Sequence, residues 1–501
     1  MMRPADKNKS PRFPANMTII GKAWRQSVVY AAGTFLLGVG QIALAPLLTR
    51  NLSVAEYGSY EVLLVTYFVL KTLLVIPLSS ALVYGQCKCC GTPEERKDLL
   101  STVSLISAML AAAFMLCGIL APRWPSLLVG AGSAASASGA IIFLALALDV
   151  FVQLGLGAFR AAEQPFHYGV AALIQLTGTL LLSGAFVGRF SMGARGVFDA
   201  MAASNLFADI FIFVALALGD RFSFRLDWAR AKPVLVFALT LVPMHAANLV
   251  SSVSDRYFLR SYWDLRTVGV YALSYRIGSG ISTLVVLPFL TAWPALIYAE
   301  KDPAAIGGYV GKAASNLWMA GMFFVAVGAA AARPLLLFLG GGKLKFLPAA
   351  EIVPIVSLGA LLYGVMQVFL SLAVARGRIY LNMKVLVAAA AAALVFNALL
   401  IPAYGMYGAA LATVLSYGTG AALAYINVSR LGPARLFFET RKALASLACG
   451  LLGAAAGRSI DGVSASRPLN FLLVVLLSSA VYISAVKMTG LMPAAPFGSR
   501  R

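Results

Sequence analysis

The sequence predicts an all-α polytopic membrane protein of about fourteen transmembrane helices, and three observations support this fold class. First, 60% of the 501 residues are hydrophobic and 12% are charged, and the mean hydropathy of +0.85 is far above that of soluble proteins. Second, apolar runs of about 18 to 25 residues recur along the chain, each long enough to cross a bilayer as a helix. Third, Lys and Arg gather in alternate connections between these runs.

The apolar runs define the predicted elements in chain order. The spans are 27–48, 61–83, 99–120, 139–158, 168–187, 196–218, 233–254, 267–293, 313–332, 348–374, 383–401, 405–427, 442–457 and 468–486. The longest hydrophilic stretch is the basic tail 1–26, so the sequence leaves no room for a soluble catalytic domain. Any function must therefore be built from the helices.

The distribution of charge predicts the topology. A net charge of +21 is compatible with nucleic-acid binding, but 26 of the 40 Lys and Arg lie in the connections that share a side with the N-terminus. The positive-inside rule places that side in the cytoplasm. We therefore predict a multi-pass protein of a bacterial inner membrane with both termini cytoplasmic, and no nucleic-acid partner.

The chain contains an internal repeat. Gly58 and Gly269 each precede a Tyr two positions on, 211 residues apart, and Gly196 and Gly408 are 212 residues apart. Each unit then holds six spans, so the two units run parallel, an arrangement typical of transporters that rock two lobes around a site near mid-membrane. The predicted domains are a cytoplasmic tail 1–26, a first lobe 27–218, a cytoplasmic linker 219–232, a second lobe 233–427, two extra spans within 428–486, and a cytoplasmic tail 487–501.

Four segments carry a family resemblance. They are LLTRNLSVAEYGSY (47–60), SDRYFLRSYWDLRTVGVYALSYRI (254–277), FLPAAEIVPIVSLGALLYG (346–364) and AYGMYGAALATVLSYG (403–418). In these segments the chain resembles the polysaccharide transporter branch, which includes the O-antigen (Wzx-like) flippases, of the multidrug, oligosaccharidyl-lipid and polysaccharide flippase superfamily. The resemblance implies a MATE-like fold of two six-helix lobes plus two extra helices, and a substrate such as an undecaprenyl-pyrophosphate-linked oligosaccharide.

Four charged residues lie deep inside predicted spans, away from the span ends: Lys71, Asp149, Asp209 and Arg276. A charge at the bilayer centre is costly, so each should face a partner or a wet cavity. In one interpretation Lys71 pairs with Asp149 or Asp209 and only stabilises the first lobe. In the other, Lys71 and Arg276, one from each lobe, hold a pyrophosphate in a central cavity.

Further basic residues are candidates for the two ends of this cavity. They are Arg50, Arg256 and Arg260 at the outer mouth and Arg25, Arg160 and Arg376 at the inner mouth, with interfacial anchoring as the alternative for each. The carboxyl groups of Asp149 and Asp209 are also candidates for exchanging H⁺ or Na⁺. We predict no metal site and no cofactor, because the cluster QCKCCG at 86–91 has poor ligand spacing.

The predicted function is transport rather than enzymatic catalysis. We expect a flippase that moves a lipid-linked oligosaccharide to the outer leaflet by alternating access, for lipopolysaccharide or exopolysaccharide synthesis, with a polysaccharide polymerase and export proteins as partners. The alternatives are a cation-coupled multidrug exporter, a flippase for a peptidoglycan lipid precursor, and a membrane glycan polymerase. The polymerase would need a large outer loop or a loop with paired carboxylates, and the sequence has neither.

Overall fold

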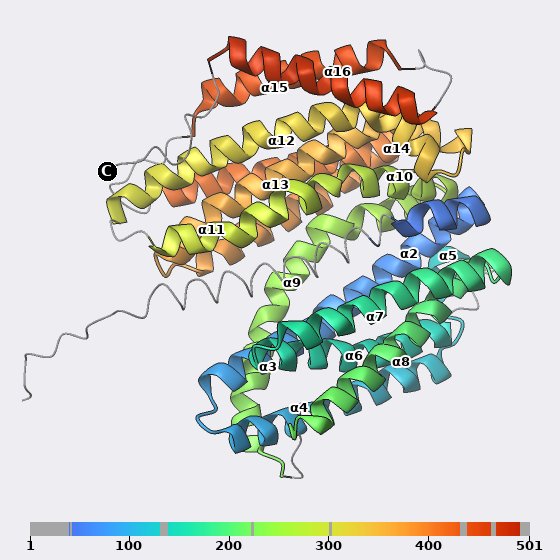
Figure 1. The fold of residues 1–501 in the computed structure, drawn as a ribbon, viewed down its shortest axis with the longest axis vertical. Helices are drawn as coiled ribbons and strands as arrows, with labels where there is room; N and C mark the ends of the chain where they lie inside the picture. Colours follow the sequence, from blue (N-terminus) through green and yellow to red (C-terminus); the bar gives the residue numbers. More distant parts are fainter. Residues whose placement is uncertain are drawn as a thin grey trace, which may run out of the picture.

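The computed structural model describes residues 40, 43–130, 139–221, 225–299, 303–430, 438–461 and 467–490, and the regular structure in these ranges is all helical (Figure 1). The helices are α2 (Val54–Leu70), η1 (Lys71–Val75), α3 (Ile76–Lys88), α4 (Pro93–Leu120), α5 (Pro125–Val129), α6 (Gly139–Ala161), α7 (Pro165–Ser183), η3 (Gly184–Arg189), α8 (Arg195–Leu218), α9 (Trp228–Tyr262), α10 (Leu265–Gly278), η4 (Ser282–Val286), α11 (Leu287–Ala299), α12 (Pro303–Leu339), η5 (Leu344–Glu351), α13 (Ile352–Ala375), α14 (Tyr380–Ser429), α15 (Thr440–Ser459) and α16 (Arg467–Met488). Within these ranges, eleven helical stretches are long and apolar enough to cross a membrane. The protein is therefore a multi-pass, all-α membrane protein, as predicted.

The longest helix, α14, contains two spans. Gly405 interrupts it with φ 54° and ψ −128°, a backbone conformation that glycine adopts and other residues avoid. Pro402 lies just before this kink. The break falls between the predicted spans 383–401 and 405–427. The predicted spans from 61–83 onward thus each correspond to helical structure, whereas most of 27–48 lies outside the described residues.

Several helices are longer than the predicted spans because polar caps start them outside the apolar run. Ser53 and Glu56 form a capping box at the start of α2, in which each side chain accepts a hydrogen bond from the other residue's backbone N–H. Asp264 caps α10 by accepting hydrogen bonds from the backbone N and the hydroxyl of Thr267, at 2.8 and 2.7 Å. Hydropathy alone detects only the apolar part of each helix.

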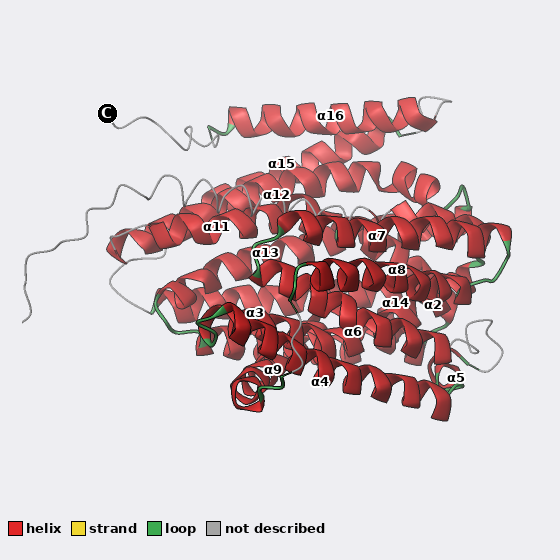
Figure 2. Ribbon diagram, turned by 60° about the horizontal axis from the view of Figure 1, so that its bottom comes forward, coloured by secondary structure: helices red, strands yellow, loops and turns green. Residues whose placement is uncertain are grey.

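The helices form two groups joined by α9. One group contains α2, α3, α4, α6, α7 and α8, and the other contains α10, α11, α12, α13 and α14, with α15 and α16 packed on α12 at the far edge (Figures 1 and 2). The long α9 packs against α3 near its start and against α14 along its length. We refer to the two groups as the first and second lobes.

The two lobes touch where α2 packs along α10. A Cβ atom at Gly58 would lie 1.8 Å from the carbonyl oxygen of Leu265, and one at Gly269 would lie 2.4 Å from that of Val54. Only glycine permits this close approach. Gly58 and Gly269 are the residues that the sequence repeat pairs, so equivalent positions of the two repeats meet at the lobe interface.

The same end of the molecule carries further contacts between the lobes. Lys343 donates a hydrogen bond from Nζ to the carbonyl oxygen of Leu52 at 2.7 Å, and Thr49 donates one to that of Leu339 at 2.5 Å. The sequence GGGKLK at 340–345 is therefore part of a contact between lobes. The lobes are therefore closed at this end, which the topology predicted from the sequence would place on the outer side of the membrane.

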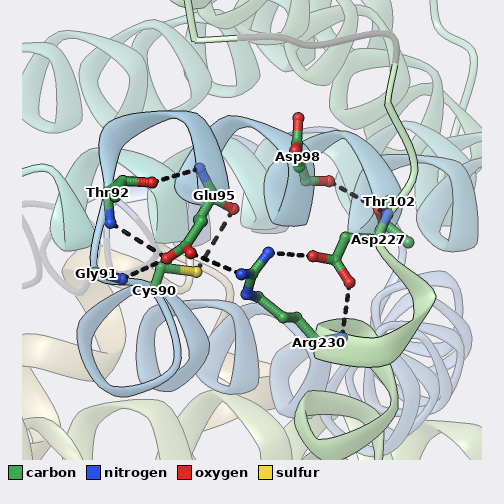
Figure 3. A network of polar contacts seen from close by, with 8 residues as sticks. All are labelled: Cys90, Gly91, Thr92, Glu95, Asp98, Thr102, Asp227 and Arg230. Carbon is green, nitrogen blue, oxygen red and sulfur yellow. Dashed lines mark hydrogen bonds and ion pairs between the residues drawn. The ribbon is translucent and has the colours of Figure 1, made fainter.

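A polar network at the opposite end ties α9 to α4 (Figure 3). Arg230 in the first turn of α9 forms an ion pair with Glu95 at 2.6 Å and another with Asp227. The backbone N of Asp227 donates to the hydroxyl of Thr102 at 2.8 Å, and Glu95 accepts from the backbone N of Gly91 at 2.7 Å. Part of the predicted linker 219–232 is thus the start of α9, held against the first lobe.

The structure supports the internal repeat at a second level. The π-helical segments η1 and η4 begin at Lys71 and Ser282 and end at Val75 and Val286, 211 positions apart at both ends. This offset is the one that separates Gly58 from Gly269. π-Helical turns are rare, so chance is a poor explanation for two such segments that begin and end at equivalent positions of the two repeats. Such turns often occur at functional sites.

Candidate functional site

A cavity of about 270 Å³ lies between α2, η1, α6, α7 and α8, and one residue of α10 reaches it from the second lobe. Its aromatic and apolar walls are interrupted by polar side chains. These include Tyr67, Lys71, Gln153, Gln175, Asn205 and Arg276. Lys71 and Arg276, which the sequence placed in different lobes, therefore line one cavity at membrane depth.

Lys71 makes an ion pair inside the first lobe. Its Nζ lies 2.6 Å from Oδ2 of Asp149, and the two side chains are 15% and 0% exposed. Lys71 opens the π-helical segment η1, in the middle of the continuous helix 54–88. The two sequence interpretations are thus compatible, because Lys71 both pairs with Asp149 and faces the cavity.

Asp149 has three further hydrogen-bond donors. The hydroxyl of Tyr67 donates to Oδ2 at 3.0 Å, and the amides of Gln153 and Gln175 donate to Oδ1 at 3.2 and 3.3 Å. Gln175 also donates to the side-chain oxygen of Asn205 at 2.8 Å. Buried charges are tolerated when such partners satisfy them. The Asp149 carboxylate would therefore keep several donors if Lys71 moved away.

The equivalent positions of the second lobe are neutral. Tyr363 and Gln367 lie 214 positions after Asp149 and Gln153, and Gln367 donates to the Tyr363 hydroxyl at 3.3 Å. Tyr417 lies 212 positions after Asn205, and its ring packs edge-on against that of Tyr363 at 5.3 Å. At these equivalent positions only the first lobe carries a charge.

Arg276 makes an ion pair between the lobes. Its NH2 lies 2.5 Å from Oε1 of Glu61 on α2, and the two side chains are 13% and 6% exposed. The pair joins α10 of the second lobe to α2 of the first. Breaking a buried pair by removing one partner typically costs about 3 to 5 kcal/mol, because the other charge remains in a low-dielectric site. The Glu61–Arg276 pair therefore contributes to holding the lobes together in this conformation.

Asp209 lies away from this cavity. It lines a separate apolar cavity of about 290 Å³, bounded by a different face of α6 and by α4. Both of its carboxyl oxygens are buried without a hydrogen-bond partner among the described residues. Of the two aspartates considered in the sequence, Asp149 is thus the partner of Lys71 and Asp209 is not.

The predicted mouth residues occupy different environments. Arg50 is exposed, and its side chain packs close to Gly341 at the end where the lobes are in contact. Arg260 donates from Nε to the carbonyl oxygen of Leu128 at 2.9 Å. Arg25 lies outside the described residues.

Arg256 differs from the prediction for an outer-mouth residue. It is buried, pairs with Asp255 at 2.8 Å, and lies 4.1 Å from the ring centre of Tyr275. Its Nε has no hydrogen-bond partner among the described residues. The neighbouring carboxylate and the aromatic rings explain why this cation is packed inside the protein.

Sequence reasoning missed Glu61 because the predicted span began at that residue. The capping box starts α2 at Val54, so Glu61 lies about two turns inside the helix rather than at its end. Sequence reasoning also did not identify Gln175 and Asn205, because a single uncharged polar residue does not stand out in a hydrophobic run. Their spacing to Asp149 becomes meaningful only once α6, α7 and α8 are packed together.

The two-lobed helical bundle and its charged cavity at membrane depth have the fold of polytopic transporters. Among solved structures, the chain is similar to the lipid II flippase MurJ in an inward closed conformation, with a TM-score of 0.74 at 14% identity over 92% of this chain and 98% of that one. It is also similar to a MATE transporter of Vibrio cholerae, with a TM-score of 0.60 at 17% identity over 83% and 98% of the two chains. An inward-facing multidrug resistance MATE transporter of the MOP superfamily gives 0.62 at 14% identity over 80% and 93%.

Comparisons by sequence give no match. No protein-family model matches the chain, and no curated protein matches it. At these identities the likeness to solved structures shows the fold, and the fold is the one that the sequence resemblance implied.

Proposed function

We propose that the protein is a flippase that carries an undecaprenyl-pyrophosphate-linked oligosaccharide from the cytoplasmic to the outer leaflet by alternating access. The observation that supports this most is the placement of Lys71 and Arg276, cations of opposite lobes, in one cavity inside the membrane. A diphosphate loses part of its hydration there and needs cationic partners. The glycan would then pass to a polymerase and export proteins for cell-surface polysaccharide synthesis.

Lys71 is the proposed diphosphate ligand of the first lobe. Binding would draw its ammonium group from Asp149 toward the phosphate oxygens. Because Tyr67, Gln153 and Gln175 also donate to Asp149, this exchange leaves the carboxylate with partners. The lobe therefore can release a cation to an anionic substrate without a large desolvation cost.

Arg276 is the proposed ligand of the second lobe, and its pair with Glu61 links binding to lobe movement. A substrate phosphate that attracts Arg276 weakens an ion pair that joins α2 and α10. Opening of the outer end would bring Arg50 and Arg260 to the exit path. Asp149 and Asp209 remain our candidates for H⁺ or Na⁺ exchange.

A flippase for a peptidoglycan lipid precursor is the second candidate. The likeness to the MurJ structure covers 92% of this chain, whereas the likeness to the two MATE transporters covers 83% and 80%. The larger coverage favours a lipid-linked sugar over a small drug. Both candidates share a polyprenyl diphosphate, so the sugar is what distinguishes them.

Reconstitution in vesicles tests the proposal. The rate at which a fluorescent undecaprenyl-pyrophosphate oligosaccharide becomes accessible on the far side is measured for wild type, Lys71→Ala, Arg276→Ala and the exposed control Arg378→Ala. We expect acceleration over protein-free vesicles by wild type and the control, and loss of at least tenfold in the other two variants, if each removes about 1.4 kcal/mol or more of binding to the diphosphate.

Two results would contradict the proposal. No acceleration with any lipid-linked sugar, in vesicles where the protein is folded, would favour the drug exporter. Acceleration that survives both cavity substitutions would remove Lys71 and Arg276 from the transport site. Comparison with a lipid-linked peptidoglycan precursor in the same vesicles separates the two flippase candidates.

A further inference from the structure

Two adjoining cavities open on the side of the first lobe that faces away from the second lobe. One, of about 380 Å³, lies at the cytoplasmic ends of α4, α6 and α8, and the other, of about 290 Å³, is the apolar cavity of Asp209. Leu100 and Leu216 line both, so the two cavities adjoin each other between α4 and α8, and we refer to them together as the groove. Figure 1 places α4 and α8 on the outer edge of this lobe.

The groove faces lipid at its deeper end. The α8 side chains Ile210 and Phe213 beside it are 53% and 64% exposed. Such large exposed apolar side chains are expected on a surface that contacts the hydrocarbon core. The deeper cavity is lined almost entirely by apolar side chains, including Phe151, Leu154 and Ile212.

The shallow end is basic. Arg96, Lys97 and Arg221 line it together with one carboxylate, Asp220. Lys97 is paired with Asp220, whereas Arg96 and Arg221 form no salt bridge within the part of the chain that the structure describes. Two guanidinium groups are thus available to an anion at the level of the membrane interface.

The depth of the groove matches one leaflet. Arg96 and Ser104 are eight residues apart on α4, and Leu216 and Asp209 are seven apart on α8. At 1.5 Å per residue, both intervals correspond to about 10 to 12 Å. The hydrocarbon of one leaflet is about 15 Å deep. A molecule with a phosphate at the arginines would therefore place an acyl chain in the apolar cavity.

We propose that this groove is a binding site for an anionic phospholipid of the cytoplasmic leaflet. The phosphate lies between Arg96 and Arg221, and one acyl chain fills the apolar cavity beside Ser104. Basic pockets between transmembrane helices on the cytoplasmic side are suited to such headgroups. The apolar extension of the groove selects a lipid over a free phosphate. The inference stands on its own, apart from the proposed transport function.

Native mass spectrometry of the delipidated full-length protein tests this site. Phosphatidylglycerol, zwitterionic phosphatidylcholine and inorganic phosphate are added separately to wild type, the double variant Arg96→Gln/Arg221→Gln, and the matched double control Lys88→Gln/Arg378→Gln. All four residues lie at the cytoplasmic end, and both control residues are exposed. We expect wild type and the control to retain phosphatidylglycerol, and the groove variant to bind it about 30-fold more weakly.

A second pair of variants tests the acyl-chain end. Ser104→Phe fills the apolar cavity and should abolish binding, whereas Asp209→Leu makes its wall more apolar and should preserve binding. Equal binding by all variants, equal binding of phosphatidylcholine, or binding of inorganic phosphate as tight as that of the lipid would each overturn the proposal. Loss of binding in the arginine variant but not in Ser104→Phe would also overturn it, because the chain would then lie elsewhere. Thermal unfolding of each variant verifies that it is folded.

Discussion

Replacing Lys71 with Met tests whether the buried carboxylate beside it is supported by more than one partner. The substitution keeps the length of the side chain and removes the ammonium group 2.6 Å from Asp149. A broken buried ion pair typically costs about 3 to 5 kcal/mol. Here three neutral donors remain at 3.0 to 3.3 Å, so we expect a loss of about 2 to 3 kcal/mol in unfolding free energy.

Removing the other partner of the ion pair provides the comparison. Asp149→Leu removes the common acceptor, leaving the Lys71 ammonium and three side-chain donors without it, so it should cost more than Lys71→Met. Equilibrium unfolding by SDS titration in mixed micelles measures both variants and the double variant. The reasoning is refuted if Lys71→Met costs as much as Asp149→Leu, or if it costs less than about 0.5 kcal/mol, a change typical of surface positions.

Four further predictions concern other parts of the molecule. Gly405→Ala should lower the unfolding free energy by about 1 to 3 kcal/mol, because alanine is strained at φ 54°, and SDS titration measures this. A membrane-impermeant maleimide should label the exposed Cys87 only from the cytoplasmic side and faster than Cys90, because burial raises the pKa of the Cys90 thiol; labelling from outside would overturn the topology. Glu61→Gln should weaken the contact between lobes and increase the outward-open population, read by spectroscopic distances between labels at the outer ends; an unchanged distribution would argue against its linking role. Burial raises the pKa of Asp264, but the hydrogen bonds that its carboxylate accepts in the first turn of α10 outweigh burial and hold the pKa below its usual range. The stabilisation by this carboxylate is therefore complete above about pH 4 and is lost as the pH falls through the lower pKa of the folded state. Asp264→Asn should remove this acid-dependent component of thermal stability.

Hydropathy predicted much of the fold because a membrane imposes a strict length and composition on each span. The sequence predicted two spans, 383–401 and 405–427, and the structure joins them in one helix that is interrupted at Gly405, where the second span was expected to begin. The repeat was also detectable, because Gly58 and Gly269 are required by close backbone contact and so persist in both units. These features are local, or depend on residue types with few substitutes.

The partners inside the site were harder to predict because they depend on packing between helices. Lys71 and Arg276 were found as charges within apolar runs, but the choice of Asp149 over Asp209 depends on which face of α6 each cavity adjoins. Arg256 was expected at a mouth, whereas the adjacent Asp255 and the ring of Tyr275 hold it inside. The position of a residue in the sequence predicts its depth along its own helix, but it does not predict which neighbouring helix the side chain will face.

The difference between the two repeats has a consequence for directionality. If the two lobes were identical, the affinity for a charged substrate would be the same in the inward-facing and outward-facing states. The rocking motion would then not favour either direction of charge movement. Here the first repeat carries the Lys71–Asp149 ion pair, while the second repeat has the uncharged Tyr363, Gln367 and Tyr417 at the positions equivalent to Asp149, Gln153 and Asn205. In the proposed function, the first repeat would supply a cation and a carboxylate from these positions, whereas the second repeat would supply its cation, Arg276, from α10.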